Sequence, residues 1–427
     1  MNKVRAGYKM TELGEIPIEW EVKRLEECTN KITDGSHTSP APVEISNYKI
    51  CTVANMKKYK LDLENSTNIS EEDYIRLIKN GCSAERGDVL LSKDGTVGKT
   101  LVYSQSGENI VFLSSIAIIR PQKNILLGEY LNQYLQETRT LERLSNTKTG
   151  SAIKRIVLKD IKNIKIIIPK IQEQERIASI LSTVDEQIDN VDALIEKNKE
   201  LKKGLMQTLL TKGIGHTKFK TTEIGEIPEE WEVVKFKEIT DILRCGVAST
   251  PTYVENGIPF LSAQNVNNEK LSLHKYNFIS EDYHKQLTKN DKPQKGDILY
   301  SRVGANYGIA AVVDIDFEFS VYVSLTLIRM KNEYDSKFYK YLLNSTVIRK
   351  QADIGVFQGG GVPNLNVKVV EKFNVVVPPK YEQIKIASIL SEVDRKIDEY
   401  ENKKQKLEEL KKGLMQQLLT GMIRVTV

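Results

Sequence analysis

The chain is poor in the residues that build disulfide frameworks and metal centres. Its 427 residues include only four cysteines and four histidines. Cys28, Cys51, Cys82 and Cys245 show no CxxC spacing, and the histidines form no HxxxH or Cys/His group. A disulfide-stabilised fold and a structural or catalytic metal site are therefore unsupported by the sequence.

Long apolar runs are also missing. No stretch approaches the ~18 consecutive apolar residues that suggest a membrane span, and the first residues, MNKVRAGYKM, lack the apolar core of a secretory signal. We therefore expect a cytoplasmic protein. Hydrophobic residues make up 40% of the chain and charged residues 28%, which is typical of folded domains. The net charge of +5 permits binding to nucleic acid through local patches without requiring it.

An internal duplication is the most informative feature. The only two tryptophans, Trp20 and Trp231, lie in matching segments, TELGEIPIEWEV at Thr11–Val22 and TEIGEIPEEWEV at Thr222–Val233. The period of about 210 residues is the size of a domain, whereas solenoids and propellers repeat every ~20–50 residues. Further matching pairs follow in the same order: Gly87–Gly98 with Gly296–Gly308, Ile177–Asp189 with Ile386–Asp398, and Leu201–Gln207 with Leu410–Gln416.

The two copies differ most in their middle parts. Lys31–Arg86 and Asp241–Lys295 align poorly, although the ends of the copies nearly coincide. Shared ends with divergent middles indicate one framework that carries two different recognition surfaces. Drift on a duplicated surface would give the same pattern, so this alternative stays open.

Each copy ends in a predicted helix of ~40 residues. Pro169 and Pro378–Pro379 precede the helices, and Gly213 and Gly421 follow where C-terminal caps belong. Apolar residues alternate spacings of four and three, which is the heptad pattern of a coiled coil. We interpret the two seams as pairing with each other; the alternative is two separate amphipathic helices. The first seam comprises Ile177, Leu181, Val184, Ile188, Val191, Ile195, Asn198, Lys202, Leu205 and Leu209, and the second Ile386, Leu390, Val393, Ile397, Tyr400, Lys404, Leu407, Lys411, Leu414 and Leu418. Asn198 and Lys404 are candidates for polar residues that set the register.

The N-terminal part of each copy has a mixed α/β (α+β) pattern. Short β-rich runs alternate with turn clusters rich in Gly, Ser, Thr and Asn. We predict strands at Tyr48–Val53, Val89–Ser92, Val111–Ile119, Ile164–Ile168, Ile258–Leu261, Ile298–Ser301, Ser320–Arg329 and Phe373–Val377, and a helix at Gly128–Leu144.

Catalytic motifs are absent or incomplete. Gly98-Lys99-Thr100 resembles the end of a phosphate-binding loop, but the required glycine five residues earlier is Lys93. Pro378-Pro379-Lys380-Tyr381 lacks the preceding Asn or Asp of a DNA amino-methyltransferase, and Glu21-x-Lys23 has no counterpart in the second copy. We therefore expect no catalytic residue in this chain, although a site assembled in space is not excluded by one sequence.

What remains are polar loops suited to bases and phosphates. Arg and Lys suit guanine, Asn and Gln suit adenine, and Ser and Thr suit phosphates. Taken singly, each loop has the composition of an ordinary turn; their recurrence at matching places favours DNA binding. The candidate residues are Thr33, Asp34, Ser36, His37, Asn55, Lys57, Lys58, Ser92, Lys93, Lys148, Lys154 and Arg155 in the first copy, and Thr250, Thr252, Tyr253, Gln264, Asn265, Asn267, Ser301, Arg302, Asn306, Tyr307 and Gln358 in the second.

At these residues the chain resembles the specificity subunit of type I restriction–modification systems, a bacterial defence against foreign DNA. The resemblance rests on Gly14-Glu15-Ile16-Pro17 leading to Trp20 and its repeat before Trp231, on Gly87-Asp88 and Gly296-Asp297, on Gln358-Gly359 with Asn364-Leu365, and on Pro378-Pro379 before Glu382–Ala387. The first copy departs from the pattern at Lys154-Arg155, where the second has Pro363-Asn364, and at Lys170.

The resemblance implies two target recognition domains, at residues 1–169 and 215–377, and two spacer helices, at 170–214 and 378–427, which form an antiparallel coiled coil. Each recognition domain is expected to read one half of a bipartite, asymmetric site on double-stranded DNA. The helices, whose seams include Leu181 and Leu390, are expected to set the gap between the half-sites and to dock two modification subunits, which methylate adenine with S-adenosylmethionine. Restriction subunits that use ATP and magnesium join that core. The main alternative is a coiled-coil scaffold for protein interactions without DNA specificity.

Overall fold

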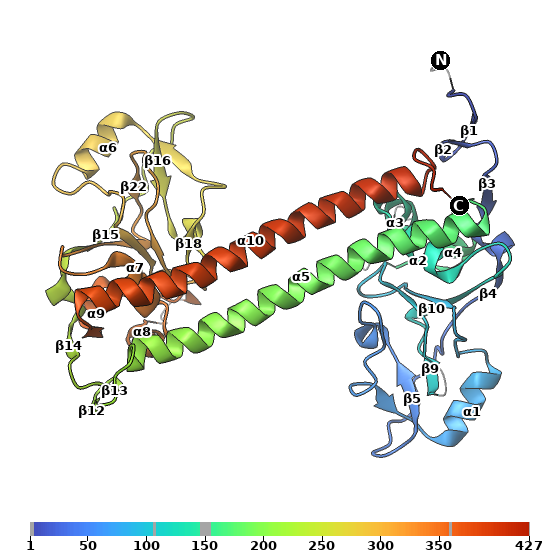
Figure 1. Cartoon of the computed structure of the whole chain (residues 1–427), viewed down its shortest axis with the longest axis horizontal. Helices are drawn as coiled ribbons and strands as arrows, with labels where there is room; N and C mark the ends of the chain where they lie inside the picture. The colour runs from blue at the N-terminus through green and yellow to red at the C-terminus, as the bar shows by residue number, and fades with distance from the viewer. Residues whose placement is uncertain (1–3, 106–107, 146–154, 358–360, 427) are drawn as a thin grey trace. The chain divides into compact units, whose positions relative to one another are not determined.

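The computed structural model describes residues 4–105, 108–145, 155–357 and 361–426. The chain divides into two compact units, Met1–Asp192 with Asn402–Val427, and Ala193–Glu401 (Figure 1). Two long helices, α5 (Ile171–Lys212) and α10 (Lys380–Leu418), each contribute one half to either unit. A unit therefore consists of the N-terminal part of one copy together with half of each long helix.

A four-stranded antiparallel sheet lies at the centre of each unit. One of its two inner strands, β7 in the first unit and β20 in the second, is buried at every position, VLLS and ILYS, because both faces of the sheet are covered. In the first unit the strand order is β4 (Thr29–Asp34), β10 (Ile116–Pro121), β7 (Val89–Ser92) and β8 (Thr100–Val102). In the second it is β15 (Thr240–Cys245), β23 (Leu325–Met330), β20 (Ile298–Ser301) and β21 (Ala310–Val312).

A smaller sheet follows in each unit and contains a parallel pair. It joins β6 (Thr67–Asn68), β5 (Tyr48–Cys51) and β9 (Asn109–Phe112) in the first unit, and β19 (Asn277–Ile279), β16 (Ile258–Leu261) and β22 (Ser320–Val321) in the second.

The prediction of single strands at Val111–Ile119 and Ser320–Arg329 is wrong. Each run is divided by a turn, closed by bonds from Ile116 N to Leu113 O (3.0 Å) and from Leu325 N to Tyr322 O (2.9 Å). The chain passes there from the small sheet to the central one. A continuous apolar run cannot reveal this change, since both strands are buried.

The remaining elements cover these sheets or join them to the long helices. The predicted helix at Gly128–Leu144 is interrupted at Glu137, whose backbone is extended. The strands are β1 (Tyr8–Thr11), β2 (Gly14–Pro17), β3 (Glu21–Arg24), β11 (Lys165–Ile168), β12 (Phe219–Thr222), β13 (Gly225–Pro228), β14 (Glu232–Lys235), β17 (Val266–Asn267), β18 (Lys270–Leu271) and β24 (Asn374–Val377). The helices are α1 (Glu71–Lys79), α2 (Gly128–Gln136), α3 (Thr138–Ser145), α4 (Leu158–Asn163), α6 (Glu281–Leu287), α7 (Ser336–Leu343), α8 (Thr346–Gly355) and α9 (Val367–Val370). Short 3₁₀ turns lie at Leu25–Cys28, Val53–Asn55, Phe236–Ile239 and Ala263–Asn265.

The two long helices pack against each other in antiparallel fashion within each unit. In the first, Ile177 and Leu181 near the start of α5 share a core with Leu418 at the end of α10. In the second, Leu210 near the end of α5 shares a core with Leu390 near the start of α10. The predicted pairing of the two seams is thus confirmed. The buried seam residues are Ile177, Leu181, Ile188, Val191, Ile195, Ile386, Leu390, Val393, Ile397 and Leu418, and the half-buried apolar ones include Val184, Leu205, Leu209, Leu407 and Leu414.

The two polar seam candidates behave differently. Lys404 pairs with Asp192 of the other helix at 2.7 Å, as a residue that sets register should. Asn198 instead donates to the Leu194 carbonyl of its own helix (2.7 Å), so its prediction as an interhelical register residue is wrong.

A buried glutamate anchors the start of each long helix. Glu173 is 1% exposed and accepts a bond from Trp20 Nε1 (3.0 Å), and Glu382 is 2% exposed and accepts from Trp231 Nε1 (3.0 Å). The second carboxylate oxygen binds Arg424 Nε (2.8 Å) in the first unit. In the second unit it contacts His216 Nε2 (2.9 Å). A buried carboxylate must be fully hydrogen-bonded. Each glutamate therefore joins three parts of its unit: the segment around the tryptophan, the start of its own long helix, and the segment that follows the C-terminal end of the other long helix.

The helix ends follow the cap prediction. Gly213 and Gly421 adopt φ values of +65° and +71°, the left-handed conformation that glycine takes after a helix. Among the described helices none combines the length and the apolarity needed to cross a membrane. The described residues also hold no group of three or more His, Cys, Asp or Glu side chains arranged for a metal ion.

The aspartate of the Gly-Asp segment before β7 and before β20 forms a buried ion pair with an arginine of the neighbouring strand. Asp297 is 1% exposed and accepts two bonds of 2.8 Å from the guanidinium of Arg329. Asp88 accepts equivalent bonds from Arg120, the shorter one from Nη2 at 2.9 Å. The preceding glycines, Gly87 and Gly296, have φ values of +94° and +92°, which disfavour any residue with a side chain.

We predict that Asp297→Ala lowers the free energy of unfolding by about 3 kcal/mol, because it leaves the Arg329 guanidinium without its buried partner. Urea denaturation followed by circular dichroism measures the change. Asp316→Ala is the control: its ion pair with Lys295 joins side chains that are 81% and 60% exposed, and its loss should change stability by less than about 1 kcal/mol. Equal shifts for both variants would contradict the prediction.

Candidate nucleic-acid interface

Three of the predicted loops of the first unit meet at one end of its central sheet. Strands β4 and β7 end there and β10 begins. Backbone bonds join the loops, from Lys93 N to Ser115 O (2.9 Å), from Ser114 N to Ser36 O (2.8 Å) and from Ile156 N to Lys93 O (2.9 Å). We call this surface, residues 33–38, 92–99, 113–115 and 155–156, the first loop edge.

The first loop edge carries two exposed candidates with side-chain nitrogens, His37 and Arg155. Lys93 is not one of them, because it is 3% exposed and pairs with Asp34 at 2.8 Å. His37, whose side chain is 68% exposed, lies 3.3 Å from the same carboxylate. Arg155 is 53% exposed and binds Asp94 at 3.0 Å. His37 and Arg155 thus remain predicted DNA contacts, whereas Lys93 supports the loop that carries them. Thr33 and Asp34 are half-buried beside them.

The equivalent loops of the second unit also meet. Val323 N donates to Val247 O (2.9 Å), Arg302 N to Ser324 O (3.0 Å) and Gly304 N to Pro363 O (3.1 Å). We call residues 246–253, 301–309, 322–324, 357 and 361–365 the second loop edge. Its exposed candidates are Thr250, Thr252, Tyr253 and Asn306. Gln264 lies close by, since the neighbouring Ala263 N donates to Ser324 Oγ (2.9 Å).

Arg302 is a clamp rather than a free contact. It is 7% exposed, and its guanidinium donates to Leu365 O (2.8 Å), Val323 O (2.9 Å) and Asn364 Oδ1 (3.0 Å). Its planar, five-donor head suits such a divergent set of acceptors. The arginine therefore fixes the second loop edge instead of reaching out from it.

Several other predicted contacts also shape their own loops. Ser92 and Ser301 are fully buried, and each hydroxyl donates to the backbone of the following turn, to Thr96 O (2.6 Å) and Asn306 O (2.5 Å). Ser36 donates in the same way to Thr38 O (2.6 Å). Tyr307 is 8% exposed and donates to Asp353 (2.6 Å).

Asn55 and Asn265 are buried at equivalent places. Asn55 Nδ2 donates to the carbonyls of Asp62 (3.2 Å) and Asn65 (3.0 Å). Asn265 Nδ2 donates to Ser272 O and Lys275 O, both at 2.9 Å. Both amides are used inside their loops, so a base contact by either side chain conflicts with its burial at 5% and 1% exposure.

The loops after these asparagines turn towards the long helices. Lys58 binds Asp189 of α5 at 2.6 Å. Burial opposes its charge, but the hydrogen bonds to Asp189 and Tyr59 together with the charge of Asp185 outweigh burial and raise the pKa of Lys58. Lys57 binds Asp62 within its own loop at 3.3 Å. Asn267 lines a cavity of about 1080 Å³ beside α5 and α10. These three residues therefore lie apart from the loop edges. Lys148, Lys154 and Gln358 fall outside the described residues.

Sequence patterns did not reveal a group of exposed apolar residues at the second loop edge and at the end of α8 that precedes it. Phe357 is 70% exposed, Ile354 88% and Val362 51%. Phe357 and Asn364 exchange two backbone bonds, of 3.1 and 3.0 Å, and Arg302 holds Asn364. The only sequence signal was the position of apolar residues on both sides of a glycine run, which composition alone does not distinguish from an ordinary loop.

We predict that Arg302→Lys loosens the second loop edge although it keeps the charge, because one ammonium cannot reach three divergent acceptors. Amide hydrogen exchange at Phe357, Asn364 and Leu365 should quicken by about tenfold or more. Arg395→Lys, at a 55% exposed site on α10, should leave these amides unchanged. Unaltered exchange in the Arg302 variant would show that the clamp is dispensable.

Comparison with known proteins identifies the family. The type I restriction modification DNA specificity domain matches residues 17–201 and again residues 228–410. The MjaVIII specificity subunit of a type I restriction enzyme from Methanocaldococcus jannaschii is 32% identical over 82% of this chain and 83% of its own length. The MjaIX specificity subunit from the same organism is 24% identical over 98% and 96%.

A solved structure shares the fold. The S subunit of a type I restriction–modification system from M. genitalium superposes with a TM-score of 0.58 at 17% identity, over 96% of this chain and 97% of that one. The tandem family match and the relatives agree with the resemblance drawn from the repeated segments. The chain therefore belongs to the family of type I restriction–modification specificity subunits, the non-catalytic recognition components of these systems, and carries two copies of their DNA specificity domain.

Proposed function

We propose that each unit reads one half of a bipartite, asymmetric DNA site. The observation that carries this proposal is that the two units share one fold but expose different side chains at the first and second loop edges. His37 and Arg155 are exposed at the first loop edge, whereas Thr252, Tyr253 and Asn306 are exposed at the second. Two edges of different chemistry favour two different half-sites.

The chemistry of the two edges supports contact with both phosphates and bases. Arginine and histidine donate to phosphates or guanine, and threonine and asparagine suit phosphates and adenine. Tyr253 and Phe357, 44% and 70% exposed, add aromatic surface for apolar contact with DNA. Two linked readers gain affinity through effective concentration, since binding of the first raises the local concentration of the second.

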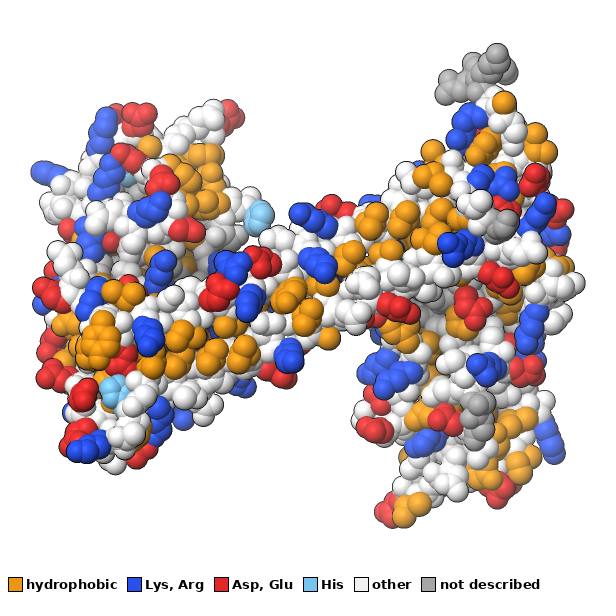
Figure 2. Space-filling model, viewed as in Figure 1, with side chains coloured by type: hydrophobic (Ala, Val, Ile, Leu, Met, Phe, Trp, Pro, Cys, Tyr) orange, Lys and Arg blue, Asp and Glu red, His pale blue; other side chains and the backbone are white. Residues whose placement is uncertain are grey.

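We further propose that the long helices dock two modification subunits, one per unit. Hydrophobic side chains gather along both helices on the face seen in Figure 2. Leu201 and Leu410 hold equivalent positions in the repeat and are each 50% exposed. Equivalent apolar positions favour two copies of one partner.

The cofactors belong to the partners in this proposal. The modification subunits would bring S-adenosylmethionine for adenine methylation, and restriction subunits would bring ATP and magnesium for cleavage. This chain would select the DNA sequence and would supply no reacting group.

The proposal predicts that the gene directs a split, asymmetric adenine-methylated motif. Single-molecule sequencing of the genome with the gene intact and deleted measures it, and the motif should vanish on deletion. If nothing changes even after the modification partner is supplied, and the complex binds DNA without the steep salt dependence of phosphate contacts, a protein scaffold without DNA specificity replaces this proposal.

Deleting one heptad from each long helix should shorten the preferred gap between the half-sites by about three base pairs, because seven residues span ~10 Å of helix and DNA rises 3.4 Å per base pair. Methylation of a library with varied gaps measures the shift. A heptad deleted from α5 alone is the control: it mismatches the seams and should reduce methylation at every gap. An unchanged gap in the double deletion would refute the spacer role.

A further inference from the structure

A strained turn lies where the second recognition domain approaches the long helices. Asn268 and Glu269, with φ values of +49° and +60°, are the only non-glycine residues with positive φ in the described part of the chain. They form the two-residue turn between β17 and β18, a geometry in which the second position favours glycine. Asparagine tolerates this conformation, but glutamate is rare in it. A strained residue of this kind points to a function for its side chain.

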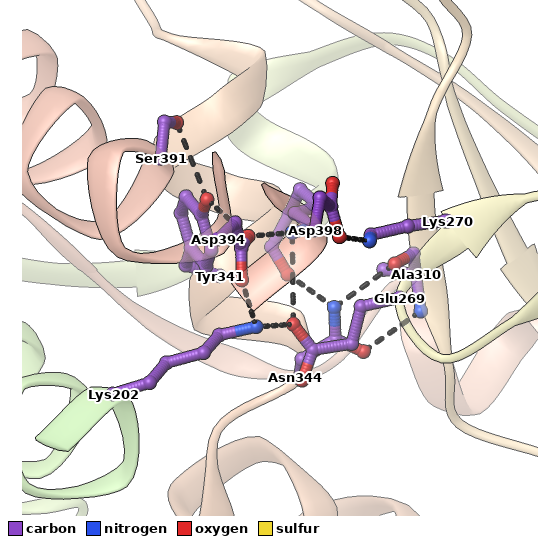
Figure 3. Close-up of polar contacts among 10 residues, drawn as sticks. Lys202, Glu269, Lys270, Ala310, Tyr341, Asn344, Ser391, Asp394 and Asp398 are labelled. Atoms are coloured by element: carbon purple, nitrogen blue, oxygen red, sulfur yellow. Dashed lines mark hydrogen bonds and ion pairs between the residues drawn. The ribbon is translucent and has the colours of Figure 1, made fainter. Parts of the chain in front are cut away.

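The side chain of Glu269 reaches the helices. Its Oε2 lies 2.7 Å from Lys202 Nζ of α5 and 3.6 Å from Lys340 Nζ of α7. The Glu269 carboxylate points at Lys202 from the recognition domain, while Asp394 of α10 contacts the same lysine (Figure 3). The next residue, Lys270, pairs with Asp398 of α10. The turn therefore contacts both long helices.

Two lysines share two carboxylates in this cluster. Asp394 lies 2.6 Å from Lys202 and 3.2 Å from Lys340, and it accepts a bond from Tyr341 Oη (2.6 Å). Lys202 and Lys340 are only 14% and 9% exposed. Burial lowers the pKa of Lys340. For Lys202, burial is outweighed by Glu269 and Asp394, which raise its pKa. Removing Glu269 would leave two buried cations with a single carboxylate.

The packing next to the turn is open, so the described contacts of the turn with the helices are the ion pairs of Glu269 and Lys270. The cavity of about 1080 Å³ separates residues 267–274 from Met206, Leu210 and Ile397 of the long helices. Apolar packing does not fill that space. The apolar core attaches the central sheet and α7 to the long helices, and the ion pairs of Glu269 add an attachment for the turn between β17 and β18.

The first unit reaches the same place on its helices with a lysine but, among its described residues, without a counterpart of Glu269. Lys58 binds Asp189 at 2.6 Å and lies 3.5 Å from Asp185, which also pairs with Lys411 of α10 at 2.8 Å. Asp185 and Lys411 are the repeat equivalents of Asp394 and Lys202. Asp189 is the repeat equivalent of Asp398, so Lys58 and Lys270 bring a cation to the same place in the two units, and the second unit adds the anion Glu269. Divergent loops that retain one attachment point indicate that the attachment itself matters.

We propose that Glu269 is a positioning residue that locks the second recognition domain to the long helices and so narrows the range of half-site gaps that the protein accepts. This proposal rests on the function proposed above. Each base pair added to the gap turns the second half-site by ~34–36° about the DNA axis. Only a domain held in one orientation can reject such a change.

The test uses the complete complex of this chain with its modification partner. Methylation is measured on a DNA library whose gap varies one base pair at a time. Glu269→Gln removes the charge and keeps the side-chain shape. We expect near wild-type methylation at the preferred gap, and discrimination against gaps one base pair longer or shorter that is weaker by roughly threefold to tenfold.

Two control variants separate loss of the Glu269 charge from other changes in the turn and on the surface. Asn268→Gly changes the turn at a position where asparagine already tolerates the φ of +49°, and it keeps the Glu269 carboxylate, so it should keep the wild-type discrimination. Glu255→Gln changes an exposed carboxylate on the same domain and should have no effect. Lys270→Gln, which breaks the second contact of the turn, should weaken discrimination in the same direction as Glu269→Gln.

Each other outcome overturns a specific claim. Equal loss of methylation at all gaps in Glu269→Gln would mean that the residue only supports folding. Unchanged discrimination in both Glu269→Gln and Lys270→Gln would refute the positioning role. If the wild-type complex methylates no split site at any gap, the proposed function itself fails, whatever the variants do.

Discussion

A buried carboxylate at the start of each long helix holds the frame together. Glu173 and Glu382 cannot be buried without partners, and each finds a tryptophan indole, Trp20 or Trp231, on one side. The other carboxylate oxygen contacts Arg424 in the first unit and His216 in the second, and each of these residues follows the C-terminal end of the other long helix. The segment around the tryptophan, the first turn of one helix and the end of the other are thereby fixed relative to one another. The recurrence of this arrangement makes the two units variants of one construction.

Different side chains hold the loops in place and lie exposed at the loop edges. Buried side chains at equivalent places, such as Ser92 and Ser301 or Asn55 and Asn265, hold the loops by bonding to backbone carbonyls. The side chains left exposed at the loop edges differ between the units. A duplicated protein can in this way change what it reads without altering what keeps it folded, since the loop backbone is satisfied from within.

The elements with a regular period were predictable, and the loop contacts were only partly so. A heptad seam requires burial at every third and fourth residue, so the spacing alone places Ile177, Leu181 and Leu390 on the buried seam. Residue type could not separate Arg155, which is exposed, from Arg302, which is enclosed by three acceptors. Arginine, serine and asparagine bind phosphates and bases with the same groups that satisfy a loop's own carbonyls. Burial alone decides between these roles.

The sequence by itself determined the duplication, the family, the two long helices and the absence of recognisable catalytic motifs, because all of these depend on local periodicity or on residue order. Only the tertiary structure decided which loops share an edge, that apparently single strands belong to two sheets, and that the turn at Glu269 reaches the helices rather than a loop edge. These properties depend on contacts between residues far apart in the chain. Lys202 and Glu269 lie 2.7 Å apart in space, but no local pattern marks either residue as the other's partner.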